Sequence, residues 1–337
     1  MASTSTPSYQ APDEAFFTRA DNVVLEVLYR DINDHDTKKL TSSKSETVAH
    51  DDSALEVLKS INDPKHPNFQ PTIFSSWDYN LNDFQSPRSF RDLVMREYVK
   101  WARTVVRHQT DVVFLSHIII YFTTALPSAI YLYYDFNILH GLAHILYIVW
   151  CSGAFTLMMH NHIHNNGVLA KKFASFDWTF PYILEPLMGH TWDSYYYHHV
   201  KAHHVEGNGP DDLSTTIRYQ RDSILAFLHY EARFMLLCWY DLPRYFISKR
   251  KYNLAFRVAC TELGSYTAMF FLARWNFKPT LFVLLLPFFI LRLGLMIGNW
   301  GQHALVDDVD PDSDFRSSIT LIDVPVRCMK YHDNSLC

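Results

Sequence analysis

The feature that most constrains this chain is a long run without a charged side chain. After Asp111, no Asp, Glu, Lys or Arg occurs from Val112 to Tyr134, and as a helix this run would extend roughly 34 Å. The hydrocarbon core of a bilayer is about 30 Å thick. Buried helices of soluble proteins rarely need uncharged runs longer than about 18 residues. The run therefore favours a membrane-spanning helix over a buried core helix.

Three further segments are apolar over a similar length, of which the second span has no charged side chain and the fourth has only Arg292. The third segment of the four is the weakest, because it contains Arg257 and Glu262. Short connections join the first to the second span, and the third to the fourth. The sequence therefore predicts an all-α integral membrane protein with four transmembrane helices in two hairpins and a cytosolic helical cap that carries the histidine clusters. The predicted spans are residues 112–134, 138–159, 253–273 and 279–298.

The distribution of basic residues predicts the orientation of these spans. Lys and Arg are frequent before the first span and between the second and third spans, whereas the two opposite turns hold only Arg274 and Lys278. By the positive-inside rule, both termini and the middle loop are cytosolic. In a eukaryote we expect the endoplasmic reticulum membrane. Within the middle loop, Pro181–Met188 and Ile224–Tyr240 are apolar but too short or too charged to span, which favours helices in the interface.

Residues 1–84 form a polar cytosolic region before the membrane domain of residues 85–337. Amphipathic stretches occur around Ala15–Tyr29 and Ser53–Ile61, and we expect a regulatory or packing role for them. No basic segment followed by an apolar core begins the chain, so no cleaved signal peptide is expected.

Overall charge and cysteine usage exclude other classes of protein. The net charge of −5 gives no basic field of the kind that nucleic-acid binding needs, so no nucleic-acid partner is expected. The five cysteines show no paired spacing, which indicates small apolar residues in a reducing compartment and not a disulfide framework.

The 18 histidines are the unusual part of the composition, and eight of them lie in three short clusters. In the first, at the end of the second span, His160 and His164 are one helical turn apart and share a face. His162 is predicted to point elsewhere. In the second, His199 and His203 form the same kind of pair, and His204 lies to one side of them, so that one helix can offer ligands to two adjacent metals.

The third cluster, Asn299 and His303, follows the fourth span on the same side of the membrane. The three clusters therefore converge at one depth. Neutral imidazoles suit iron, copper or zinc, and a site made almost wholly of histidine argues against calcium or magnesium.

With these motifs the chain resembles the membrane fatty acid desaturase and hydroxylase superfamily over residues 85–332. The matching motifs are H-x3-H at His160, H-x3-HH at His199 and N-x3-H at Asn299. The resemblance implies two iron ions that activate dioxygen and remove hydrogen from an unactivated C–H bond of a fatty acyl or other long aliphatic chain. It also implies a separate electron donor, cytochrome b5-like or ferredoxin-like. The implied metal ligands are His160, His164, His199, His203, His204, His303, His332, and Asn299 through water.

One departure from this pattern concerns the last motif. The family closes with H-x2-HH about 30 residues after the N-x3-H histidine, and here His332 is followed by Asp333-Asn334-Ser335-Leu336-Cys337. We therefore expect a chain that is cut short inside its last ligand motif, with weakened binding of one iron.

Several other residues are candidates for supporting roles. Gly207–Asp212 is first of all a turn signal, and Asp211 and Asp212 could also orient ligand histidines from behind by accepting a ring N–H. His198 is expected behind the ligands as well. Arg292 could contact a substrate carboxylate or headgroup, or extend toward the interface.

Two other functions compete with an oxidoreductase. A histidine-liganded metal transporter would need its histidines near the bilayer midplane, whereas the main clusters lie at span ends. A catalytically impaired desaturase-like protein would fold in the membrane without holding two irons. Metal content per chain distinguishes these two hypotheses from each other and from an oxidoreductase.

Overall fold

The computed structural model describes residues 19–36, 44–67, 69, 71–74 and 90–303, and within these ranges the chain is helical and contains no strand. The chain divides into two compact units that meet between Val113 and Phe114. The boundary expected after residue 84 lies outside the described residues, as does His332.

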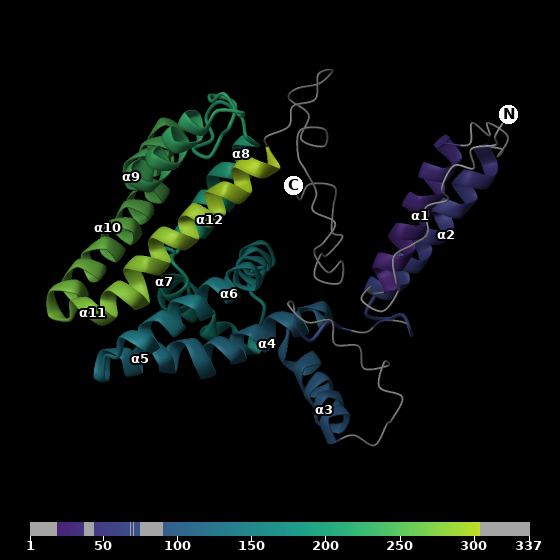
Figure 1. Cartoon of the computed structure of the whole chain (residues 1–337), viewed down its shortest axis with the longest axis horizontal. Helices are drawn as coiled ribbons and strands as arrows, with labels where there is room; N and C mark the ends of the chain where they lie inside the picture. The colour runs from purple at the N-terminus through teal and green to yellow at the C-terminus, as the bar shows by residue number, and fades with distance from the viewer. Residues whose placement is uncertain (1–18, 37–43, 68, 70, 75–89, 304–337) are drawn as a thin grey trace, which may run out of the picture. The chain divides into compact units, whose positions relative to one another are not determined.

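The first unit contains helices of the N-terminal part. Helices α1 (Arg19–Asp36) and α2 (Lys44–Asn62) pack against each other and contain the described part of the two amphipathic stretches (Figure 1). Helix α3 (Phe90–Val105) and the short turn η2 (Gln109–Asp111) follow.

Three helices of the described chain are long and apolar enough to cross a membrane. They cover Gln109–Tyr134, Ile138–His164 and Phe277–Gln302, and correspond to the first, second and fourth predicted spans. The first contains α4 (Val112–Ile120), η3 (Tyr121–Ala125) and α5 (Leu126–Tyr134), the second is α6 (Ile138–His164), and the third contains α11 (Phe277–Thr280), η7 (Leu281–Leu285) and α12 (Leu286–Gln302).

Asn137 separates the first two of these helices. Its side-chain oxygen accepts hydrogen bonds from the backbone N–H groups of Leu139 and His140, at 2.8 and 3.3 Å. An asparagine at this position satisfies two of the N–H groups that a helix start leaves without a partner. Helix α6 therefore begins at the predicted start, Ile138, and continues past the predicted end to include His164.

Prolines explain the π-helical turns inside these long helices. Pro127 follows η3 and Pro287 follows η7. A proline ring clashes with the carbonyl four residues earlier, and that carbonyl, from Thr123 or Val283, lies inside the π-helical turn. The wider turn lets the helix continue through the proline.

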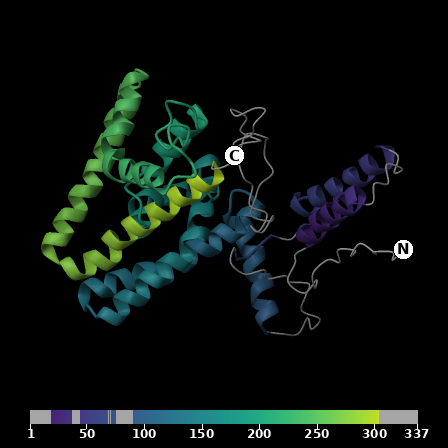
Figure 2. The same ribbon diagram turned by 45° about the horizontal axis from the view of Figure 1, so that its top comes forward.

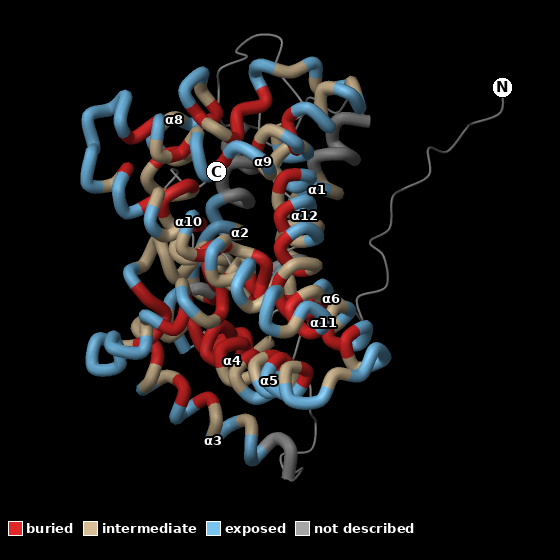
Figure 3. The backbone as a smooth tube through the Cα atoms, turned by 90° about the vertical axis from the view of Figure 1, so that its left-hand side faces the viewer, coloured by how far each residue is buried: buried red, intermediate tan, exposed pale blue. Residues whose placement is uncertain are grey.

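Helix α10 (Tyr252–Trp275) occupies the third predicted span. Its 24 residues are about 36 Å long, but it is not among the three helices that are apolar enough to span, as the charges of Arg257 and Glu262 suggested. The structure therefore supports three of the four predicted spans, and the fourth span and the hairpin topology stay predictions. Exposed residues recur along α10 (Figure 3), and Phe256 and Phe270 are among its exposed apolar side chains.

The two apolar segments of the middle loop are helical as well. Pro181–Met188 overlaps the turn η5 (Phe180–Leu184) and the short α7 (Glu185–Leu187). The segment Ile224–Tyr240 begins α9 (Ile224–Ser248), which runs eight residues farther than predicted in spite of Pro243 and packs alongside α10 (Figure 2).

The second histidine cluster rests on the α9–α10 pair. It lies on η6 (Tyr196–His203), which is followed by the single turn α8 (His204–Glu206). Tyr197 and Ala202 of η6 pack in one buried cluster with Phe246 of α9 and Val258 of α10. Burial of this apolar face fixes the orientation of η6 and, with it, the orientation of the histidines on its polar face.

A buried ion pair ties α10 and α12 to the loop before η6. Thr191 donates to Glu262 at 2.6 Å and accepts from Arg292 at 2.8 Å, and the Arg292 and Glu262 charges lie 3.7 Å apart. Arg292 is only 3% exposed and stacks over Phe288 at 4.3 Å. Arg292 therefore does not extend toward the interface, one of the two roles considered for it. It joins three segments of the second unit instead.

We expect single replacements in this pair to destabilise the protein strongly. Glu262→Gln or Arg292→Met leaves one charge buried without its partner, which costs about 3–5 kcal/mol. The double variant should recover much of that loss, because no buried charge remains. Thermal unfolding in detergent measures the effect. Asp241→Asn is the control, because the Arg233–Asp241 pair is partly exposed and should contribute about 1 kcal/mol or less. Equal unfolding temperatures for all variants would contradict the expectation.

Candidate metal centre

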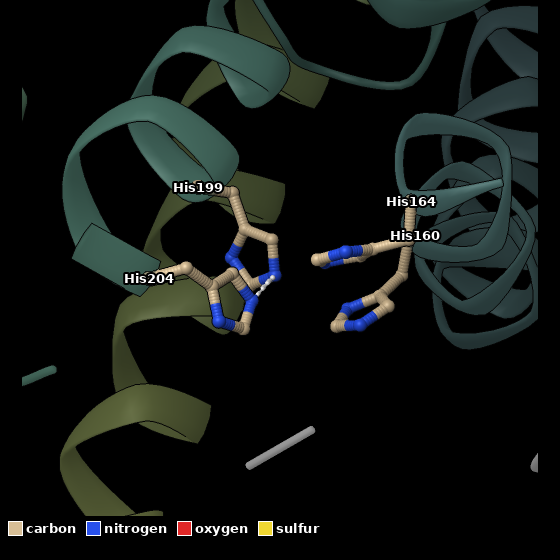
Figure 4. A group of neighbouring side chains, drawn as sticks. All are labelled: His160, His164, His199 and His204. Atoms are coloured by element: carbon tan, nitrogen blue, oxygen red, sulfur yellow. Dashed lines mark hydrogen bonds between the residues drawn. The ribbon is translucent and has the colours of Figure 1, made fainter. Parts of the chain in front are cut away.

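Four histidines from two separate segments face one another in the second unit. His160 and His164 project from the last turns of α6, and His199 and His204 approach from η6 and α8 (Figure 4). One ring nitrogen of each residue lies within 4.8 Å of the others, so the four rings could hold one metal ion. Ring centroids are 4.7 Å apart for His160 and His199, and also for His164 and His204.

Helical phase explains the contribution of α6. His160 and His164 are four residues apart on an α-helix, and their rings lie 4.6 Å apart on one face. His162 lies on another face, where it stacks on Phe180 at 3.8 Å. The structure thus brings together the pair that the sequence predicted and separates His162 from it.

The winding of η6 alters the pairing that the sequence predicted for the second cluster. There, His199 was expected to share a face with His203. The segment instead forms a π-helix, and the backbone N–H of His204 donates to the carbonyl of His199, five residues earlier. Because the wider turn carries the fifth residue back toward the first, His204 comes beside His199, and their Nε2 atoms are hydrogen-bonded at 2.9 Å.

His203 is held by a carboxylate instead of joining the group of four. Its Nδ1 lies 2.6 Å from Asp212 Oδ2 and 3.2 Å from Ser214 Oγ. An engaged Nδ1 orients the ring and directs Nε2 to any metal. The ring of His303, in the turn after α12, lies 6.3 Å from that of His203. His203 and His303 therefore form a second imidazole pair beside the group of four.

A tight turn brings Asp212 to His203. Gly207 and Asn208 both have left-handed backbone conformations, with φ of 53° and 56°, which reverse the chain after α8. Asp212 also accepts hydrogen bonds from the backbone of Asn208 and from the N–H and hydroxyl of Ser214. Burial raises the pKa of this carboxyl, but the hydrogen bond and charge of His203 prevail, and the pKa falls to about 2. Asp212 is thus a fixed anion behind His203.

The neighbouring Asp211 has a different role from the one considered for it. Its carboxylate is 64% exposed and pairs with Lys249 at 2.9 Å. Asp211 therefore supports the surface of the turn and does not orient a histidine.

Asn299 and His198 also lie outside the group of four, and the ring of His198 is 6.3 Å from that of His203. The Asn299 side-chain N–H group donates to the Ser214 carbonyl at 3.0 Å and to the Tyr230 hydroxyl at 2.8 Å. Asn299 thus joins α12 to the loop that holds His203. His198 is nearly buried, with its ring edge-on to Phe234 at 5.2 Å.

Burial keeps the imidazoles of His199 and His204 neutral. It lowers the pKa of His199 well below the usual value, and the neighbouring imidazoles, His160 first, lower it further. Burial together with His164 and His203 lowers the pKa of His204 to about 4, against a smaller opposite effect of Asp212. Neutral imidazoles are the form that binds metal.

Other polar residues of the spans lie apart from this centre. His140 and His144 of α6 both hydrogen-bond to the Ser128 hydroxyl, at 2.8 and 2.9 Å. They form a local polar contact between α5 and α6, four or more turns from His160.

Comparison of the chain with protein-family models, with curated proteins and with solved structures finds no match. A functional assignment therefore depends on the geometry of the histidines.

We expect alanine substitution to distinguish histidines of α6 that bind metal from histidines of α6 that do not. His164→Ala should lower metal affinity by more than the roughly 10- to 100-fold typical of supporting residues, because it removes a ligand nitrogen. His162→Ala is the matched control and should leave metal content unchanged, since that ring stacks on Phe180. Elemental analysis and chelator competition on the purified chain measure both. Equal losses in the two variants would show that the cluster is not the metal site.

The two adjacent aspartates provide a second comparison. Asp212→Asn keeps the size of the side chain but removes the charge behind His203, and should weaken metal binding about 10- to 100-fold. Asp211→Asn removes a charge one residue away and should leave metal affinity unchanged. Chelator competition distinguishes the two variants. An equal effect of both would argue for a general charge effect of the turn.

Proposed function

We propose that this chain is a membrane-bound di-iron oxidoreductase, a desaturase or hydroxylase of a fatty acyl or other long aliphatic chain. The observation that carries the proposal is the meeting of His160 and His164, at the end of an apolar membrane-length helix, with His199 and His204. A site in this position suits a substrate that is itself apolar and dissolved in the bilayer.

The donor set fits a transition metal. All four residues of the group are imidazoles, and the Nε2 atom of His164 is buried without a hydrogen-bond partner in the described part of the chain. A buried ring nitrogen left unpaired in this way is costly unless a further group binds there. Histidine nitrogen selects iron, copper or zinc over calcium or magnesium.

In this proposal, His160, His164, His199 and His204 hold one iron, and His203 and His303 contribute to the second, together with His332 and, through water, Asn299. When bound, the irons would supply dioxygen activation and removal of hydrogen from an unactivated C–H bond. Asp212 keeps a proton on His203 Nδ1 and thereby fixes which nitrogen faces the metal. The apolar helices exclude water around the reacting chain.

The proposed setting is the endoplasmic reticulum membrane of a eukaryote, with both termini cytosolic. Electrons come from a separate carrier, because no haem-binding or flavin-binding motif is visible in the sequence. A cytochrome b5-like or ferredoxin-like protein is the expected donor. The histidine group lies in the last turns of α6 and not at its middle, which favours an enzyme over a metal transporter.

The proposal predicts iron in the purified protein and oxidised lipid in the host. The full chain, expressed in a eukaryotic host with its own electron carrier, should contain iron in preference to zinc and should add double bonds or hydroxyl groups to host acyl chains. The His199→Ala variant should lose both properties together. Elemental analysis and mass spectrometry of extracted lipids provide the readouts. Zinc in place of iron, with unchanged lipids, would overturn the proposal and favour a transporter.

A further inference from the structure

An aromatic cluster connects the surface of the second unit to the neighbourhood of His203. Tyr219, Tyr230 and Trp300 touch one another, with ring centroids 5.5 Å apart for the two tyrosines, 5.1 Å for Tyr230 and Trp300, and 6.1 Å for Tyr219 and Trp300. Tyr230 is 2% exposed, whereas Tyr219 and Trp300 are half-buried. Tyr230 and Trp300 come from α9 and α12, which pack against each other, and the cluster has an inner end at Tyr230 and an outer end at Tyr219 and Trp300.

Hydrogen bonds continue from the inner end of the cluster to the candidate metal centre. The Tyr230 hydroxyl donates to the Ser214 carbonyl at 3.4 Å and accepts from Asn299 at 2.8 Å. The Ser214 hydroxyl in turn lies 3.2 Å from His203 Nδ1. From His203, the rings of His199 and His204 are 5.5 and 5.6 Å away. A continuous path of rings, short covalent segments and hydrogen bonds thus joins Trp300 to the group of four histidines.

The outer end of the cluster offers contacts for a protein with negative charge. Tyr219 meets the exposed His229 edge-on at 5.5 Å. Arg218 and Arg221 lie on either side of Tyr219 in the chain, and Arg218 is exposed. The Arg218 guanidinium donates to the Pro210 carbonyl, and because its side chain is exposed, it offers positive charge and further N–H donors to a carboxylate of a docked partner.

We propose that Trp300, Tyr219 and Tyr230 form the route by which electrons enter the metal centre from a docked one-electron carrier protein with an acidic surface. The inference rests on the proposed function, because only a redox-active centre needs such a route. Electron tunnelling slows steeply with distance, and closely spaced aromatic rings shorten each step. The same rings pack against the buried core of Phe234 and Met296, and the Tyr230 hydroxyl joins Asn299 to the Ser214 carbonyl, so only the rate of electron transfer distinguishes a route from packing.

The electron balance is that of an oxygen-dependent desaturation or hydroxylation. Each transfer oxidises the reduced carrier by one electron and reduces one ferric ion to ferrous. For a desaturation, two such electrons and two protons from solvent, together with the two hydrogens removed from the chain, convert one dioxygen to two waters. The carrier is the only reductant that this scheme requires besides the substrate chain itself.

The experiment compares two reductants on the iron-loaded full chain, without substrate. Stopped-flow spectroscopy follows reduction by a reduced cytochrome b5 soluble domain, used as the probe carrier, and by dithionite, which does not need the aromatic route. Trp300→Leu and Tyr230→Leu should slow reduction by the cytochrome several-fold and leave reduction by dithionite unchanged. Tyr230→Phe, which keeps the ring and loses the hydroxyl, should fall between wild type and Tyr230→Leu.

The control is Trp239→Leu, because Trp239 is an exposed tryptophan of α9 outside the cluster, and its reduction by both reductants should match wild type. Unchanged cytochrome rates in Trp300→Leu and Tyr230→Leu at equal iron content would overturn the route while leaving the proposed function intact. A wild-type protein that neither reductant reduces would instead refute the proposed function, and the route with it.

A measurement on the metal-free chain excludes the explanation that a variant is reduced slowly only because it has lost iron. In the metal-free chain, ruthenium tris-bipyridine photo-oxidised to Ru(III) with persulfate as the electron acceptor should oxidise Trp300 at the outer end, and the oxidising equivalent should reach Tyr230, whose hydroxyl proton passes to water. Electron paramagnetic resonance should then detect a tyrosyl radical that disappears in Tyr230→Phe and decreases in Trp300→Leu. A radical of equal yield in all variants would place the acceptor elsewhere and overturn the route.

Discussion

The candidate centre depends on the mutual repulsion of histidines that lie too close together to be charged. Four ring nitrogens within 4.8 Å of one another would repel strongly if two or more rings carried protons, and burial strengthens that repulsion. The arrangement is stable only with neutral rings, or with a cation between them that their lone pairs can bind. The same burial that disfavours protonation therefore prepares the group for a metal. The surrounding helices maintain that burial while leaving the nitrogens directed inward.

Supporting contacts hold the two sides of the centre with different degrees of rigidity. On one side, His160 and His164 belong to a continuous helix of 27 residues that Asn137 caps, so their relative position follows from helix geometry alone. On the other side, η6 depends on several contacts with distant segments. The apolar core with α9 and α10 fixes its buried face, and Asp212 fixes His203. The buried pair of Arg292 and Glu262 holds the loop that leads into it.

Sequence reasoning was strongest where local periodicity decides the structure. Runs without charge predicted the three apolar helices, and four-residue spacing predicted that His160 and His164 share a face while His162 does not. The prediction was weaker for α10, because Glu262 is buried in an ion pair with a residue of another helix that the sequence does not reveal.

The pairing of His199 with His204 was missed, since residue spacing assumes α-helical winding. Of the two aspartates, only contacts across the turn could show that Asp212 faces a histidine and Asp211 a lysine. The contacts of Tyr230 with Trp300 and Asn299 were not predicted either, since these residues come from segments far apart in sequence.

The π-helical winding of η6 means that ligand identity here is encoded in the backbone as well as in the side chains. A π-helical segment corresponds to an α-helix that accommodates one surplus residue. If the segment rewound as a regular α-helix, His203 would turn toward the ring of His199 and His204 would turn away, although no histidine had changed. The same six histidines therefore encode two alternative coordination patterns. A ligand that favours tighter winding would exchange one pattern for the other, whereas deletion of one residue between His199 and His204 would leave them four residues apart and keep their pairing.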